Sequence, residues 1–131
     1  MHLETPRPLS LDLEPAIERV TACLAEVGFG VMSRIDVHAA LKKKLDVDHE
    51  PTVILGACNP KLAHRGFQED PRFVLAVPCN VVVRQAGPGA VEVAMVDPVK
   101  LLAADDMTAN EVLSGIAAEA HDCLAKAAAA L

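Results

Sequence analysis

The chain contains no tryptophan and no tyrosine, and three phenylalanines make up its whole aromatic content of 2%. Proteins that bind single-stranded nucleic acids stack bases on aromatic side chains, so this composition disfavours that function. Basic residues are also scarce, because 12 Lys and Arg stand against 18 Asp and Glu, with a formal net charge of −6. The basic run Lys42 to Lys44 is too short to form the cationic surface that binds a phosphate backbone. We therefore expect no nucleic-acid partner.

Long hydrophobic runs are missing as well. The alanine-rich segment 117–131 is interrupted by charged residues such as Glu119 and Lys126, so it is unsuited to spanning a bilayer. Segment 1–6 lacks the basic and apolar regions of a secretory signal. We therefore expect a cytoplasmic protein with no membrane partner. In a reducing compartment its four cysteines are expected to be buried thiols, metal ligands or redox groups rather than disulfides.

Hydrophobic residues make up 52% of the 131 residues, which is typical of an ordered globular chain. This length suits a single domain, 1–131, with an ordered core of about 9–130. Apolar periodicity and capping residues predict a helix between Asp12 and Gly28, short helices at 37–45, 60–67 and 98–103, and a long helix after a capping box at Thr108 to Glu111. Alternating or continuous apolar runs predict strands at 31–36, 52–57, 73–83 and 91–95.

The order of these elements predicts an α+β fold. Strands in the middle and long helices at both ends favour a two-layer sandwich, in which the N- and C-terminal helices pack on one face of a mostly antiparallel sheet. A doubly wound parallel sheet is the alternative, but the turn at 85–90 is too short for a parallel crossover. Val74, Ala76 and Val82 make the second face of the long strand apolar, so we expect a homodimer that covers this face or an edge strand. Pro78 within that strand predicts an edge or a bulge.

Two segments, 54–60 and 78–83, each place a cysteine directly before an asparagine beside an apolar run. Asn59 is the expected cap of the helix that begins at Pro60, so Cys58 would lie next to the partial positive charge of a helix N-terminus. Such a position lowers the pKa of a thiol and makes it a nucleophile, redox group or metal ligand. The simpler interpretation is that Cys58 and Cys79 are small core hydrophobes. We name Cys58, Asn59, Cys79 and Asn80 as candidate ligand-binding residues.

His64 completes the candidate site. It lies about one helical turn after Pro60, and with Cys58 and Cys79 it could form a metal site of two sulfurs and one nitrogen, suited to Zn or Cu. The plainer interpretation is an isolated surface histidine. Cys23 and Cys123 fall near the apolar stripes of the terminal helices and are expected in the core.

The sequence also resembles a known family. The segments 28–31, 35–37, 54–60 and 78–83, in this order and spacing, are similar to those of the prokaryotic family called domain of unknown function 302 (DUF 302), over roughly residues 13–103. The resemblance implies a small α+β fold with helices on one face of an antiparallel sheet, and it implies homodimers. It implies no activity.

Two hypotheses for function follow. The first is a small, non-enzymatic binding or interaction domain that takes a soft metal or a small molecule at the Cys58 and Cys79 segments. The alternative is a thiol-dependent redox or transfer enzyme, with Cys58 as the attacking thiol, Cys79 as the resolving partner and His64 as the base. The two hypotheses share one requirement, which is that the two cysteines meet in one pocket.

Overall fold

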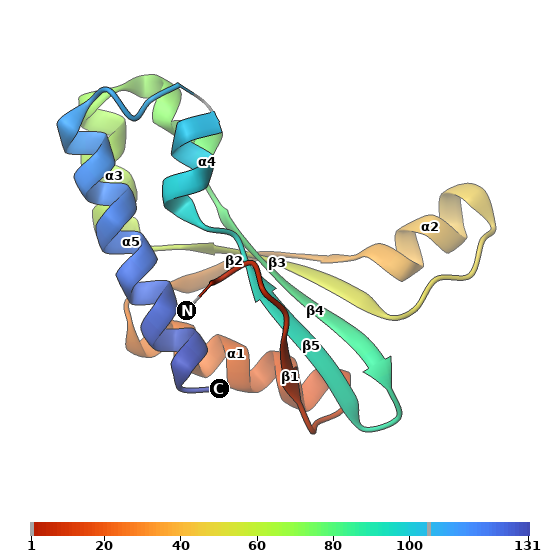
Figure 1. The fold of residues 1–131 in the computed structure, drawn as a ribbon. Helices are drawn as coiled ribbons and strands as arrows, with labels where there is room; N and C mark the ends of the chain where they lie inside the picture. Colours follow the sequence, from red (N-terminus) through yellow and green to blue (C-terminus); the bar gives the residue numbers. More distant parts are fainter. Residues whose placement is uncertain (1, 105) are drawn as a thin grey trace.

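The computed structural model describes residues 2–104 and 106–131, and Figure 1 shows how they fold. Within these residues, one antiparallel sheet has the strand order β1-β5-β4-β3-β2. Its strands are β1 (Arg7–Leu9), β2 (Gly30–Asp36), β3 (Thr52–Cys58), β4 (Cys79–Gly87) and β5 (Ala90–Met95). The helices are α1 (Leu13–Glu26), α2 (Val37–Leu45), α3 (Pro60–Glu69), the 3-10 helix η1 (Pro71–Ala76), α4 (Pro98–Ala104) and α5 (Glu111–Ala129). The predicted α+β class is confirmed.

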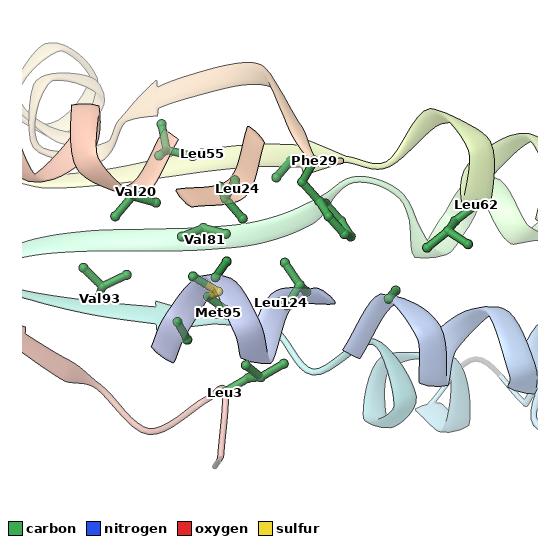
Figure 2. Packing of buried hydrophobic residues seen from close by; sticks show 14 of the residues in the cluster. Leu3, Val20, Leu24, Phe29, Leu55, Leu62, Val81, Val93, Met95 and Leu124 are labelled. Atoms are coloured by element: carbon green, nitrogen blue, oxygen red, sulfur yellow. The ribbon is translucent and has the colours of Figure 1, made fainter. Parts of the chain in front are cut away.

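The core lies between the sheet and the two long helices. Helix α1 contacts β2, β4 and β5, and α5 lies beside α1 and also contacts α3 and α4. One side of the sheet is sealed by this layer, and Figure 2 shows how its side chains meet those of the helices. Fully buried members from both layers include Leu55, Val81, Val93, Leu24 and Leu124. Among the described residues, no helix combines the length and apolarity that crossing a membrane requires.

The start of the chain takes part in the sheet, which the sequence patterns did not indicate. Strand β1 pairs with β5 at the sheet edge, and the backbone N–H of Met95 donates to the C=O of Leu3 at 2.9 Å. The Leu3 side chain is 3% exposed. The packed core therefore extends to residues before position 9. Strand β1 has only three residues, and one of them is a proline, so its sequence is too short to show the alternation that predicts a strand.

The long strand predicted at 73–83 was wrong in its first half. Residues Pro71–Ala76 form η1, and β4 begins at Cys79. The Asp70 side chain starts the 3-10 turn by accepting the backbone N–H of Arg72 at 2.9 Å. Pro78 was expected at an edge or a bulge, but it directly precedes β4, which is a central strand, and its peptide bond with Val77 is cis. Phe73 and Ala76 turn into the core instead of continuing the alternation.

The long C-terminal helix is confirmed, but its cap is not the predicted one. Asn110, rather than Thr108, caps α5, because its side-chain oxygen accepts the backbone N–H groups of Val112 and Leu113 at 3.0 and 3.1 Å. Ser, Thr, Asn and Asp all make good caps, so two candidates that lie two positions apart are hard to separate by sequence. The turn predicted at 85–90 is also shorter in the structure, because β4 continues to Gly87 and β5 begins at Ala90.

The other side of the sheet has no helical cover among the described residues. Strand pairing places Ile35, Ile54, Val82 and Ala94 in one row across β2, β3, β4 and β5. Paired residues of an antiparallel sheet point to the same face, so this row forms an apolar open face, on which the Ile35 side chain is 52% exposed. A bulge after Val31 sets this register by shifting β2 against β3. Of the three residues predicted for an exposed second face, Val82 alone belongs to it.

Helix α2 stands apart from the helix layer. It lies at the far end of β2 and β3, where Figure 1 shows it projecting from the body of the molecule, and none of its residues is buried. Its contacts are with β2 and β3. His38 anchors it, because its Nδ1 atom accepts the backbone N–H of Thr52 at 3.1 Å. Leu45 and, just beyond the helix, Val47 are 66% and 43% exposed. The arm formed by α2 therefore carries apolar surface without a partner from its own chain among the described residues.

Candidate functional site

The two cysteine segments meet at one end of the sheet. They line a partly open cavity of about 40 Å³ that is bounded by the ends of β3 and β4 and by α3, η1, α4 and α5. Cys58, Asn59 and Cys79 contribute the sulfur and amide groups, and most other lining side chains are apolar, including Phe29 and Phe73. We call this space the two-thiol cavity. The requirement that both cysteines share one pocket is met.

Strand pairing explains why residues 21 positions apart become neighbours. In the β3–β4 ladder Ala57 lies directly opposite Cys79, and Cys58 is the next residue after Ala57. Asn59 then ends the strand and caps α3, with its Oδ1 atom accepting the backbone N–H of Leu62 at 3.3 Å. The predicted Asn59 cap and the helix start at Pro60 are both confirmed. Cys58 is buried and Cys79 is half-buried.

Burial, rather than the helix N-terminus, governs the two thiols. Burial raises the pKa of the Cys58 thiol. It also raises the pKa of the Cys79 thiol to about 11, with a smaller contribution from the negative charge that Cys58 would carry as a thiolate. Moving a thiolate out of water is costly, and burial is the largest cause of the raised pKa at both cysteines. The expectation of an activated thiolate at Cys58 was therefore wrong, and both groups are neutral thiols at pH 7.

Two of the five candidate residues lie outside the two-thiol cavity. Asn80 is exposed, and its backbone C=O accepts the N–H of Val96 at 2.9 Å. In β4 it pairs with Gly56, so its side chain points to the open face. His64 is exposed on α3 and does not line the cavity. In the part of the chain that the structure describes, no three His, Cys, Asp or Glu side chains are grouped closely enough to hold a metal ion. The ligand set of Cys58, Cys79 and His64 is not assembled.

The sequence patterns missed the aromatic walls of the cavity. Phe29 follows Gly28, whose φ of 84° closes the turn after α1, and it is 2% exposed. Phe73 packs against the backbone of Gly66 so closely that a Cβ atom there would overlap its ring. It also meets Phe67 edge-on, with ring centroids 6.1 Å apart. The only signal for these residues was their apolarity, which is shared by half of the chain.

An antiparallel sheet with one helix-covered face, and a small apolar cavity at one end of it, define an α+β domain. The chain belongs to a family: the family model described as "Domain of unknown function DUF302" matches residues 6–131. The resemblance drawn from residues 13–103 is thus confirmed over nearly the whole chain.

A solved structure supports the same assignment. The chain is similar to the crystal structure of an uncharacterized conserved protein DUF302 from Bacillus stearothermophilus, with 30% sequence identity and a TM-score of 0.84. The similarity covers 99% of this chain and 98% of the other. Comparison with curated proteins gave no match.

Proposed function

We propose that the chain is a non-enzymatic binding domain and that the two-thiol cavity is its site. The observation that carries this proposal is the convergence of Cys58, Asn59 and Cys79 on one apolar cavity, from two segments that are adjacent only in the folded chain. Binding sites in proteins are typically apolar pockets with a few polar groups that orient the ligand. Here two neutral thiols and one amide take that role.

The proposed ligand is small and uncharged. A cavity needs roughly 10–15 Å³ of such volume to hold a single water molecule, so about 40 Å³ suits a group of a few non-hydrogen atoms. A charged ligand would lose its hydration without meeting an opposite charge, because the polar groups named above are neutral. The thiols offer weak hydrogen bonds and polarisable sulfur atoms, which favour a soft or apolar ligand.

Acetone and acetate test the proposal, because they have the same shape and differ in charge. Titration of the isotope-labelled protein with each, followed by backbone amide shifts, should show saturable changes at the cavity residues with acetone and not with acetate. The variant Ala117→Leu fills the cavity, since Ala117 is a buried lining residue, and should abolish the response. The matched control Ala118→Leu, at the exposed neighbouring position of α5, should keep it. Equal responses to the two probes, or no saturable change, would refute this site.

A soft metal is a second candidate, because two sulfur ligands share the cavity. Structural zinc sites need four ligands, and no third ligand is grouped with the two cysteines among the described residues. Thiolates also select Cu(I), so the pair fits Cu(I) better than Zn. Both thiols must lose protons to bind, so affinity should rise as pH increases above 7. Titration against a competing Cu(I) chelator should show a sharp loss in Cys58→Ser and none in Cys123→Ser. Equal affinity in Cys58→Ser and the parent protein would assign the cysteine pair to packing.

The thiol-dependent enzyme is the weaker alternative. An attacking thiol reacts as the thiolate, and burial disfavours that form for both cysteines. The proposed base, His64, is exposed and outside the cavity lining. No observation supports a complete catalytic arrangement. A cytoplasmic location remains part of the proposal, and it is supported by four cysteines that are all free.

We also propose that the protein is a homodimer that buries the open face. The apolar row from Ile35 to Ala94 and the exposed residues Leu45 and Val47 of the α2 arm are surfaces that a monomer would leave in water. A second copy is the proposed cover, because the arm carries Lys43 and Lys44 while the chain as a whole is acidic, so the arm of one copy complements the charge of the other.

Light scattering coupled to size-exclusion chromatography tests the dimer. The parent protein should have twice the 13.8 kDa mass of the chain at micromolar concentration. Ile35→Glu should shift it to a monomer, because a charge would be buried in the apolar row. Val112→Glu is the matched control, since Val112 is 46% exposed on α5, and it should leave the dimer intact. A monomeric parent protein would contradict the proposal.

A further inference from the structure

A second and larger cavity lies at the other side of the core from the two-thiol cavity. It has a volume of about 270 Å³ and is formed by the N-terminal segment, β1, β5 and the end of α5. Its floor is apolar and sealed, because Leu3, Val93, Met95 and Ala128 are each at most 7% exposed. Exposed residues of the segment that precedes β1 form its rim.

The rim carries positive charge. Arg7 lines this cavity and pairs with Val93 in the β1–β5 ladder, so its stem lies on the same side of the sheet as that buried valine. The Arg7 guanidinium forms no ion pair with the residues that the structure describes. His2 is a second lining residue, and its imidazole ring can donate a hydrogen bond. The acidic neighbour Glu4 is engaged elsewhere, because it pairs with Lys100 at 3.1 Å.

We propose that this cavity binds a small monocarboxylate with an apolar body. An arginine fork matches the two oxygens of a carboxylate, and the sealed apolar floor suits a hydrocarbon chain or ring. The end of α5 sets the direction of the ligand. Its last carbonyl groups carry partial negative charge, so the apolar end faces Ala128 and Leu131 while the carboxylate faces Arg7.

The volume limits the size of the ligand. A cavity of about 150 Å³ accepts benzene in another protein, so about 270 Å³ admits a body larger than a single six-membered ring. An eight-carbon acid is of this size. This inference is independent of the function proposed for the two-thiol cavity, because the two cavities share no lining residue.

Methyl NMR of methionine gives a direct test. Met95 lies in the cavity floor, whereas Met32 is 72% exposed on β2 and serves as an internal reference. Titration with octanoate, kept below its micellar concentration, should shift the Met95 methyl signal saturably and leave Met32 unchanged. Octan-1-ol has the same chain without the charge, and it should bind about tenfold more weakly or worse, because a charge-assisted bond to arginine is lost.

Matched arginine variants separate recognition of the carboxylate charge from hydrophobic binding of the hydrocarbon chain. Arg7→Gln should weaken octanoate about tenfold and leave octan-1-ol unaffected, whereas Arg19→Gln, at an exposed position on α1, should change neither. The proposal is overturned if Met95 does not respond, if octanoate and octan-1-ol bind equally, or if Arg7→Gln binds octanoate as well as the parent protein does. None of these outcomes bears on acetone or Cu(I) at the two-thiol cavity, so failure here and failure there are distinguishable.

Discussion

Because Phe73 packs closely on Gly66, we expect a glycine-to-alanine substitution to destabilise the protein at position 66 of α3 and to stabilise it at position 115 of α5. An alanine Cβ at position 66 would overlap the Phe73 ring, which is 7% exposed and packed on α3. Gly115 is also inside a helix, α5, but a Cβ atom there meets nothing within 4 Å. The two positions therefore share the gain in helix propensity and differ in the steric cost.

The magnitudes follow from these two terms. Replacing glycine by alanine inside a helix stabilises it by about 1 kcal/mol, so Gly115→Ala should raise the free energy of unfolding by about 0.5–1 kcal/mol. Forcing an extra carbon into a packed core costs typically about 1–3 kcal/mol, because the neighbouring ring must leave its preferred position. For Gly66→Ala this cost cancels or exceeds the propensity gain, and we expect a net loss of up to about 2 kcal/mol.

Urea unfolding followed by circular dichroism measures both variants. The two free energies should differ by the steric cost of about 1–3 kcal/mol, which corresponds to melting temperatures separated by roughly 4–11 °C in a domain of this size. In a Phe73→Leu background the penalty of Gly66→Ala should shrink, because a smaller side chain leaves room for the Cβ atom. If Gly66→Ala stabilises the protein as much as Gly115→Ala does, the close ring contact is absent in solution and the geometry of the two-thiol cavity wall is wrong.

Two further predictions concern the cysteine segments. The folded-state pKa of Cys79, about 11, lies above that of an unfolded thiol, so the neutral thiol stabilises the fold below pH 9. About 3 kcal/mol of this stability is lost as pH rises from 9 to 11. Chemical unfolding across this range should show a smaller decrease of the unfolding free energy with pH in Cys79→Ala than in Cys123→Ala. Asn59→Ala removes the α3 cap and should cost about 1 kcal/mol, similar to Asn110→Ala at α5, and hydrogen exchange of the first α3 turn should rise in the former alone. A Cys79→Ala slope as steep as the parent's, or unchanged α3 exchange, would contradict the respective assignment.

Local signals were sufficient for most elements. The helix ending before Gly28 was predictable because its apolar spacing and its terminal glycine agree, and that glycine does adopt a φ of 84°. The start of α3 was predictable for the same reason, since Asn59 and Pro60 are a strong cap and first-turn pair. These features depend on residues a few positions apart, which is the range over which sequence patterns are informative.

Segment 73–83 shows where such patterns fail. Its apolar residues alternate as in a strand, but the Asp70 cap, Pro71 and the packing of Phe73 on Gly66 turn the first half into η1. The alternation is compatible with both structures, and contacts with α3 and α4 decide between them. Strand β1 is a similar case, because pairing with β5, rather than any propensity of its own, makes it a strand.

The sequence by itself determined that Cys58 and Cys79 end apolar strands next to capping residues, and it determined the family. It did not determine their chemical state. A helix N-terminus lowers the pKa of a thiol and burial raises it, and the balance depends on how many atoms from α3, η1, α4 and α5 exclude water around the sulfurs. This packing is set only by the tertiary structure. Long-range contacts form the cavity, leave His64 outside it, and keep both thiols protonated.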